Sequence, residues 1–238
     1  METIRLSPRL QAAADFVLPG RPAADVGTDH GYLPVYLRQN GVCDSVIASD
    51  IAPAPLESAR ASARKYDVDG VDFRLCPGLE GIRQAEADTV VIAGMSGETM
   101  ITILEAANWD WTGKRLVLQP MTKRAELLMW LYTHGLHVEA ETFAEEGEKQ
   151  YWILCVEAGE RPMPRKAHLW AGFTETDYAM KLAWRLRRAL MGLKKAETPD
   201  EAQMRELRSI LEDMDDAYGW TDICVFEGQG PAGTEAGL

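Results

Sequence analysis

Short apolar runs alternate with amphipathic segments along most of this chain. The runs have the length of strands, and the segments between them repeat apolar residues at three- and four-residue spacing, which predicts helices. This alternation favours a mostly parallel sheet with right-handed crossovers. The expected strands are residues 23–26, 45–49, 71–75, 89–93 and 115–119, and the expected helices are residues 4–17, 33–39, 55–65, 99–107 and 123–134.

Two further apolar runs, residues 138–143 and 151–156, follow each other without a helix between them. The polar stretch 145–148 separates them, which predicts an antiparallel hairpin. Parallel strands that end in an antiparallel hairpin are typical of class I methyltransferases, whereas a dehydrogenase would continue with a sixth parallel strand. The expected fold is therefore α/β and Rossmann-like.

The pattern changes after Gly159, and residues 161–164 are an expected linker. Two helical segments follow, and Thr198-Pro199 supplies a cap and first-turn signal between them. Their apolar stripes predict a helical hairpin, or coiled coil. We therefore expect a first domain at 1–160, a helical domain at 161–226 and a disordered Gly-rich tail at 227–238. The stripes comprise Leu169, Phe173, Met180, Ala183, Trp184 and Leu190 in the first segment, and Met204, Leu207, Leu211, Met214 and Tyr218 in the second.

The formal net charge of −12 disfavours a nucleic-acid partner when it is taken as a single number. Residues 161–214, however, carry 11 Lys and Arg against 8 Asp and Glu, so a basic excess is local to the helical segment. The chain has neither a secretory signal pattern nor an apolar run of roughly 18 residues, so we expect a cytoplasmic protein without a membrane partner. The four cysteines never form a C-x-x-C pair, and we expect neither a metal site nor disulfides.

The first strand runs into a glycine turn that opens a helix, which is where α/β proteins bind nucleotides. Asp25 ends the strand, and Asp29 stands where a second glycine of a phosphate cradle is expected. A carboxylate about 4 Å from a pyrophosphate would cost roughly 4 kcal/mol at an effective dielectric near 20. The turn therefore favours a cationic ligand such as S-adenosylmethionine. Gly27 would let a ligand approach the backbone, although a tight turn needs glycine without any ligand as well.

Two more strand ends are expected at the same crevice. Asp50 follows Asp25 by 25 residues, near the roughly 20-residue spacing at which an acidic side chain reaches ribose hydroxyls. Alternatively, Asp50 caps the helix that begins near Pro53. Gly94 and Gly97 follow the fourth strand, where they leave room for a substrate or only form a turn, and Gln119 would place a neutral amide in the same region.

Other candidates have two interpretations each. His30 is a general base, or it caps the new helix or orients Asp29. Tyr32 stacks on a base, or it packs in the first helical turn. The basic residues of the helical segment contact RNA, or they form a solvated helix face: Lys181, Arg185, Arg187, Arg188, Lys194, Lys195, Arg205 and Arg208.

Four strings together resemble the bacterial tRNA adenine-22 N1-methyltransferases: Leu6-Ser7-x-Arg9-Leu10, the run from Asp25 to Pro34, Ile92–Met95 and Leu116–Pro120. The most specific of these is the run D-x-G-T-D-H-G-Y-L-P. The resemblance is close over residues 1 to about 158, whereas the helical segment resembles that of the family only in its general type. It implies a Rossmann-like S-adenosylmethionine domain joined to a C-terminal coiled coil that helps to hold tRNA.

The resemblance and the strand ends together assign residue roles. Asp29, with His30 and Tyr32, is expected to act at the target adenine. The cofactor would be held by Asp25, Gly27, Thr28, Asp50, Ile51, Gly78, Leu79, Ala93, Gly94 and Met95. Contacts with tRNA are expected from Arg9, Arg185, Arg188, Lys194 and Lys195.

The chain departs from the family pattern at three positions: Pro77 replaces a usual Asp, Ser96 a usual Gly, and Met121 a usual Asn. The expected function is S-adenosylmethionine-dependent methylation of N1 of adenine in tRNA. The alternatives are a class I methyltransferase for a small molecule or protein, and a non-catalytic binding module. The sequence leaves the oligomeric state open, and a monomer is compatible with it.

Overall fold

The computed structural model describes residues 2–174, 177–196 and 198–220. The chain divides into two compact units, Met1–Pro162 and Met163–Leu238. The expected tail at 227–238 lies outside the described residues, as do residues 221–226 of the expected helical domain.

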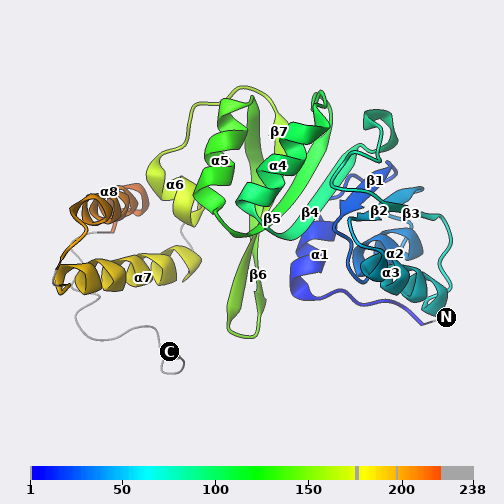
Figure 1. Cartoon of the computed structure of the whole chain (residues 1–238), viewed down its shortest axis with the longest axis horizontal. Coiled ribbons are helices and arrows are strands. Elements are labelled where there is room, and N and C mark those ends of the chain that lie inside the picture. Colours follow the sequence, from blue (N-terminus) through cyan, green and yellow to red (C-terminus); the bar gives the residue numbers. More distant parts are fainter. Residues whose placement is uncertain (1, 175–176, 197, 221–238) are drawn as a thin grey trace. The chain divides into compact units, whose positions relative to one another are not determined.

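In the described part of the first unit, seven strands form one sheet in the order β3-β2-β1-β4-β5-β7-β6 (Figure 1). Strands β1 to β5 run parallel, and β7 is antiparallel to both β5 and β6. This order confirms the expected parallel sheet with a terminal antiparallel hairpin. The strands are β1 (Ala23–Val26), β2 (Val46–Asp50), β3 (Val71–Leu75), β4 (Thr89–Ser96), β5 (Arg115–Thr122), β6 (Leu136–Glu146) and β7 (Lys149–Ala158).

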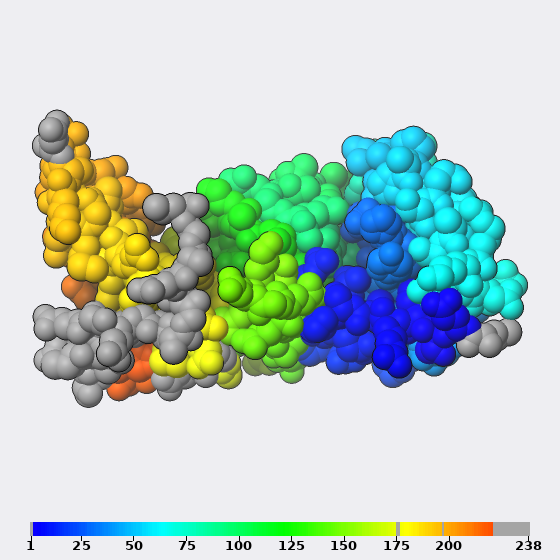
Figure 2. All heavy atoms as spheres, turned by 90° about the horizontal axis from the view of Figure 1, so that it is seen from below, coloured from blue at the N-terminus to red at the C-terminus, as the bar shows by residue number. Residues whose placement is uncertain are grey.

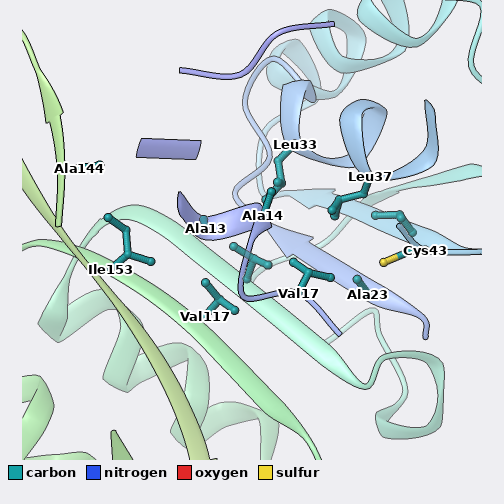
Figure 3. Packing of buried hydrophobic residues seen from close by; sticks show 12 residues of the cluster. Ala13, Ala14, Val17, Ala23, Leu33, Leu37, Cys43, Val117, Ala144 and Ile153 are labelled. Atoms are coloured by element: carbon teal, nitrogen blue, oxygen red, sulfur yellow. The ribbon is translucent and has the colours of Figure 1, made fainter. Parts of the chain in front are cut away.

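The strand order reverses between β1 and β4, and in such sheets a crevice opens there at the carboxyl ends of the strands. A buried apolar cluster joins Leu33 and Leu37 to the sheet below this crevice, through residues such as Val117 and Ile153 (Figure 3). The helices of this unit are α1 (Pro8–Ala14), α2 (Tyr32–Gln39), α3 (Pro53–Lys65), α4 (Gly97–Ala107) and α5 (Arg124–Thr133), with a short 3-10 turn at Gln84–Glu86.

The first helix is shorter than its apolar spacing predicts, because it begins at Pro8 and not at residue 4. Proline disfavours helical backbone at the residue before it, and Ser7 is accordingly extended, with φ −65° and ψ 157°. Ile4 is still buried, but as part of an extended segment whose main-chain N–H donates to Gln39. The prediction of helix was therefore wrong over residues 4–7, and it was also wrong over residues 15–17, because α1 ends at Ala14.

The N-terminal segment and the β6–β7 hairpin lie side by side, although they are far apart in the sequence. Figure 2 shows the dark-blue N-terminal residues against the yellow-green hairpin, and the main-chain N–H of Arg9 donates to Glu146 at 2.8 Å. Ala13 and Ala14 of α1 share a buried cluster with Ala144 of the hairpin. This contact forms one wall of the crevice.

The second unit contains α6 (Lys166–Ala171), α7 (Asp177–Lys194) and α8 (Glu201–Tyr218) in its described residues. The expected first segment is broken after α6, where Gly172 has φ +101°. Met180 is 39% exposed, so it does not belong to the apolar stripe as predicted. The cap of α8 is Asp200, whose Oδ1 accepts from the Gln203 N–H, and not Thr198.

An apolar cluster that includes Leu186, Leu190, Leu207 and Leu211 packs α7 against α8, as the stripes predict. Arg165 before α6 holds Asp213 and Asp216 of α8 through its guanidinium, at 2.7 Å and 2.6 Å. Within the described residues, none of the helices is long and apolar enough to cross a bilayer.

Candidate active site

The turn between β1 and α2 places three alternate residues in the left-handed region: Gly27 at φ +78°, Asp29 at +51° and Gly31 at +68°. Asp29 thus adopts the conformation of the glycine whose place it takes, which aspartate tolerates better than most residues. Gly31 is the N-cap of α2, and a Cβ atom there would lie 2.6 Å from the Cβ of Ala59 on α3. The glycine therefore allows close packing of the two helices.

A cavity of about 820 Å³ opens at the carboxyl ends of β1, β2 and β4. It is bounded on one side by the β1–α2 turn and on the other by the N-terminal segment and the β6–β7 hairpin. Its lining comprises Arg5, Ser7, Arg9, Leu10, Asp25, Gly27, Thr28, Asp29, His30, Tyr32, Leu33, Asp50, Ala93, Gly94, Met95, Met121, Glu146 and Tyr151. Ten of these residues are among the expected catalytic and cofactor-binding set, and Arg9 was expected to contact tRNA.

Asp25 is buried at the end of β1, with 6% of its surface exposed. Burial raises the pKa of its carboxyl group to about 6; the Thr28 side chain opposes this rise and the nearby charge of Asp50 adds to it. Asp50 lines the same cavity, and its Oδ1 accepts from the Ala52 N–H at 2.9 Å. Because Ala52 is the N-cap of α3, the alternative role of Asp50 as that cap was wrong.

The end of β4 forms the wall opposite this turn. A Cβ atom at Gly27 would overlap the terminal methyl group of Met95, so this side chain lies directly over the glycine backbone. The register of β4 against β5 shifts around Met95. Ser96 caps α4 by accepting from the Thr99 N–H, and this local role accounts for serine where glycine is usual.

The expected catalytic residues lie at the exposed mouth of the cavity. The side chains of Asp29 and His30 are 73% and 55% exposed, and Nε2 of His30 lies 3.8 Å from Oδ1 of Asp29. The rings of His30 and Tyr32 stack with centroids 5.5 Å apart. Gly31, and not His30, is the N-cap of α2, so the capping alternative for His30 was wrong and its pairing with Asp29 remains.

Three expected cofactor residues do not line the cavity. Ile51 is 74% exposed after β2, whereas Leu79 is buried after β3. Gly78 lies beside Leu79, and a Cβ atom there would lie 3.1 Å from Ile103. Their cofactor roles stay predictions.

The far wall contains residues that the sequence analysis did not single out as site residues: Arg5, Ser7, Leu10, Glu146 and Tyr151. Burial of the Glu146 carboxyl group raises its pKa. Hydrogen bonds from the Ser7 side chain and the Arg9 main chain outweigh this effect, so the pKa of Glu146 is below its usual value. The proximity of the hairpin tip to the N-terminal segment has no local sequence signal, because these contacts join residues up to 137 positions apart.

The remaining expected tRNA contacts lie on or just after α7, in the second unit. Arg185, Arg188, Lys194 and Lys195 are all exposed, and the Arg188 guanidinium lies 4.6 Å from the Trp184 ring. Arg187 differs from them, since it is paired with Asp215 at 2.7 Å. The exposed cations of α7 remain predicted RNA contacts.

The residues present fit S-adenosylmethionine. The cavity volume is within the range of small-molecule sites. Asp25 and Asp50 supply anionic acceptors for an ammonium group and for hydroxyls, and Gly27 and Gly94 leave the backbone bare at φ +78° and +84°. Such bare backbone lets a ligand approach closely.

The sheet order, the terminal hairpin and the acidic crevice define a Rossmann-like methyltransferase. The family model "Methyltransferase domain" matches residues 6–154. The tRNA (adenine(22)-N(1))-methyltransferase of Bacillus subtilis is 39% identical over 163 residues, which are 68% of each chain. The chain therefore belongs to the family of bacterial tRNA (adenine-22-N1)-methyltransferases, as its sequence motifs predict.

Solved structures agree over a longer stretch. The crystal structure of the B. subtilis m1A22 tRNA methyltransferase TrmK superposes with a TM-score of 0.75 and 28% identity, over 90% of this chain and 99% of that one. A Streptococcus pneumoniae putative tRNA (m1A22) methyltransferase in complex with S-adenosyl-L-methionine gives 0.72 and 28% over the same shares.

Proposed function

We propose that this protein transfers the methyl group of S-adenosyl-L-methionine to N1 of adenine 22 in tRNA. The observation that carries the proposal is the convergence of Asp25, Asp50, Gly94 and Asp29 on one cavity of a tRNA methyltransferase fold. The carboxylates of Asp25 and Asp50 suit a cationic cofactor, and Asp29 lies at the mouth of the cavity, where a large substrate would arrive.

When the cofactor is bound, Asp25 would accept a hydrogen bond from its ammonium group. Asp50 would accept from the hydroxyls of its ribose, because acidic residues at this strand end do so in nucleotide-binding folds. The bound cofactor supplies a methyl group on a positively charged sulfur. Gly27 and Gly94 would allow the backbone to lie against it, and Met95 would contact it beside Gly27.

At the open end, the chain's residues align the adenine and do not activate it. N1 of neutral adenine already carries an in-plane lone pair, so alignment and exclusion of water matter more than a strong base. Asp29 accepts from the exocyclic amine and stabilises the positive charge that develops on the purine. His30 holds the Asp29 carboxylate toward the base, and Tyr32 provides a ring on which the extruded base stacks.

The exposure of Asp29, His30 and Tyr32 supports a macromolecular substrate, because these side chains become enclosed only when something large covers the mouth. The exposed cations of α7 supply contacts for the phosphate backbone. We infer that tRNA is the partner and that the protein acts in the cytoplasm, where tRNA is modified.

Methyl-labelled S-adenosylmethionine tests this function against its alternatives. The full chain is incubated separately with bulk tRNA from cells that lack the modification, with a protein extract and with a small-molecule extract. We expect label only in the tRNA sample, as 1-methyladenosine in its nucleosides. Label in protein or in small molecules alone would support the other methyltransferase interpretation, and cofactor binding without transfer would support a binding module.

A further inference from the structure

The guanidinium of Arg9 is held in the cavity wall by neutral groups. Its Nη1 donates to Oε1 of Gln119 at 3.0 Å, and its Cζ lies 5.4 Å from the centroid of the Tyr151 ring. Its Nε is buried without a hydrogen-bond partner. The Glu146 carboxylate accepts from the main-chain N–H of Arg9 and not from its side chain. In the described part of the chain, no carboxylate lies within ion-pair distance of this guanidinium, although the charge of Arg9 also helps to lower the pKa of Glu146.

Arg9 lies at the end of β4, beside Gly94. A Cβ atom at Gly94 would be 3.3 Å from its Nη1, so the cation rests against the end of β4. The same cavity also holds carboxylates at Asp25, Asp29, Asp50 and Glu146 and a second guanidinium, that of Arg5, which is exposed. A cation that is fixed in position but not neutralised by a carboxylate contact is arranged to accept a ligand oxyanion.

We propose that Arg9 is the oxyanion-binding residue of this cavity and that Gln119 is the positioning residue that aims it. Gln119 is 1% exposed, so its amide oxygen is fixed, and being neutral it leaves the charge of Arg9 available. This inference rests on the proposed function, in which two oxyanions enter the cavity: the carboxylate of the cofactor's amino-acid part, and a phosphate of the target nucleotide. Planar guanidinium binds both groups in the same bidentate way.

Calorimetry on the wild type and Arg9→Gln distinguishes the two sources. S-adenosylhomocysteine carries the carboxylate and 5′-methylthioadenosine lacks the amino-acid part. Adenosine 5′-monophosphate and adenosine, titrated in the presence of saturating S-adenosylhomocysteine, differ only in the phosphate. We expect Arg9→Gln to weaken the binding of the oxyanion-bearing ligand of one pair by about tenfold or more, which is the strength of a charge-assisted hydrogen bond. The binding of the other ligand of that pair should not change. The unchanged member also shows that the variant is folded.

A loss confined to the first pair assigns the carboxylate, and a loss confined to the second assigns the phosphate. If Arg9→Gln still prefers the oxyanion-bearing ligand in both pairs as strongly as the wild type does, the proposal is overturned. Gln119→Glu is the second variant: it keeps the shape of the anchor but makes an ion pair that neutralises Arg9, so it should reproduce the same loss. These titrations contain no RNA, and methylation of tRNA by the wild type is scored separately. Failure of the oxyanion site is therefore distinct from failure of the proposed function.

Discussion

Asp25 and Asp50 end the neighbouring strands β1 and β2, and the charge of Asp50 adds to the burial that raises the pKa of Asp25 to about 6. Asp25 is therefore partly protonated at mildly acidic pH when no ligand is bound. A cationic ligand favours the ionised form, so its binding and the proton compete for Asp25.

Cofactor affinity should consequently depend on pH. Above pH 6 Asp25 is ionised, and the affinity for the cofactor does not change with pH. As the pH falls below 6 the carboxyl group gains a proton, and the dissociation constant of the cofactor rises by up to about tenfold per pH unit. Calorimetric titration with S-adenosylhomocysteine between pH 5 and 8 measures this. Asp25→Asn should bind weakly at every pH with no inflection near 6, and an unchanged inflection in that variant would contradict the assignment.

Asp29 should matter for transfer and not for cofactor binding. Asp29→Ala should lower the rate of tRNA methylation by roughly 100-fold, the size of one electrostatic contact to a developing charge. Because residue 29 has φ +51°, Asp29→Asn is the matched variant: asparagine tolerates this backbone and removes only the charge. Both variants should bind S-adenosylhomocysteine like the wild type; full activity in Asp29→Asn would show that its charge plays no part.

Gly27 is expected to be essential for cofactor binding. In Gly27→Ala the new methyl group meets Met95 and fills the space over the turn, so the affinity for S-adenosylhomocysteine should fall more than about tenfold. Gly41→Ala is the control, since Gly41 has a similar φ of +65° but nothing within 4 Å of its Cβ position. Both variants should lose about 1 kcal/mol of unfolding free energy. An equal loss of affinity for S-adenosylhomocysteine in both variants would show that the effect comes from stability alone.

The sequence predicted the sheet and one side of the cavity well, because each depends on local patterns. β1 and β3 have the predicted bounds, and the turn from Asp25 to Tyr32 lies at the crevice as its glycines and carboxylates indicate. These signals are contiguous in the chain, so the pattern alone locates them.

The other side of the cavity could not be predicted from local patterns. Tyr151 and Glu146 reach it only because the hairpin continues past its pairing with β5, at Leu118 and Leu154, and packs on α1. Arg9 was expected on a tRNA-binding surface, and its position beside Gly94 depends on the same long-range packing. The break at Gly172 was missed because apolar spacing continues across it.

The cations of α7 should determine tRNA affinity. Replacing Arg185 and Lys194 by alanine should raise the KM for tRNA and lower the slope of log affinity against log salt by about 1 for each lost phosphate contact. Cofactor affinity should not change. The double variant Arg205→Ala/Arg208→Ala on α8 is the control, because it removes the same number of exposed positive charges. Filter-binding across a salt series measures the slopes, and equal slopes in all three proteins would remove α7 from the RNA-binding surface.

Mass spectrometry of nucleosides from two matched transcripts tests the central claim most directly. One is a full-length tRNA with adenine at position 22, and the other differs only by guanine there; each is incubated with the full chain and S-adenosylmethionine. The account predicts about one 1-methyladenosine per molecule in the first transcript and none in the second. Equal amounts of 1-methyladenosine in both transcripts, or none in either, would contradict it.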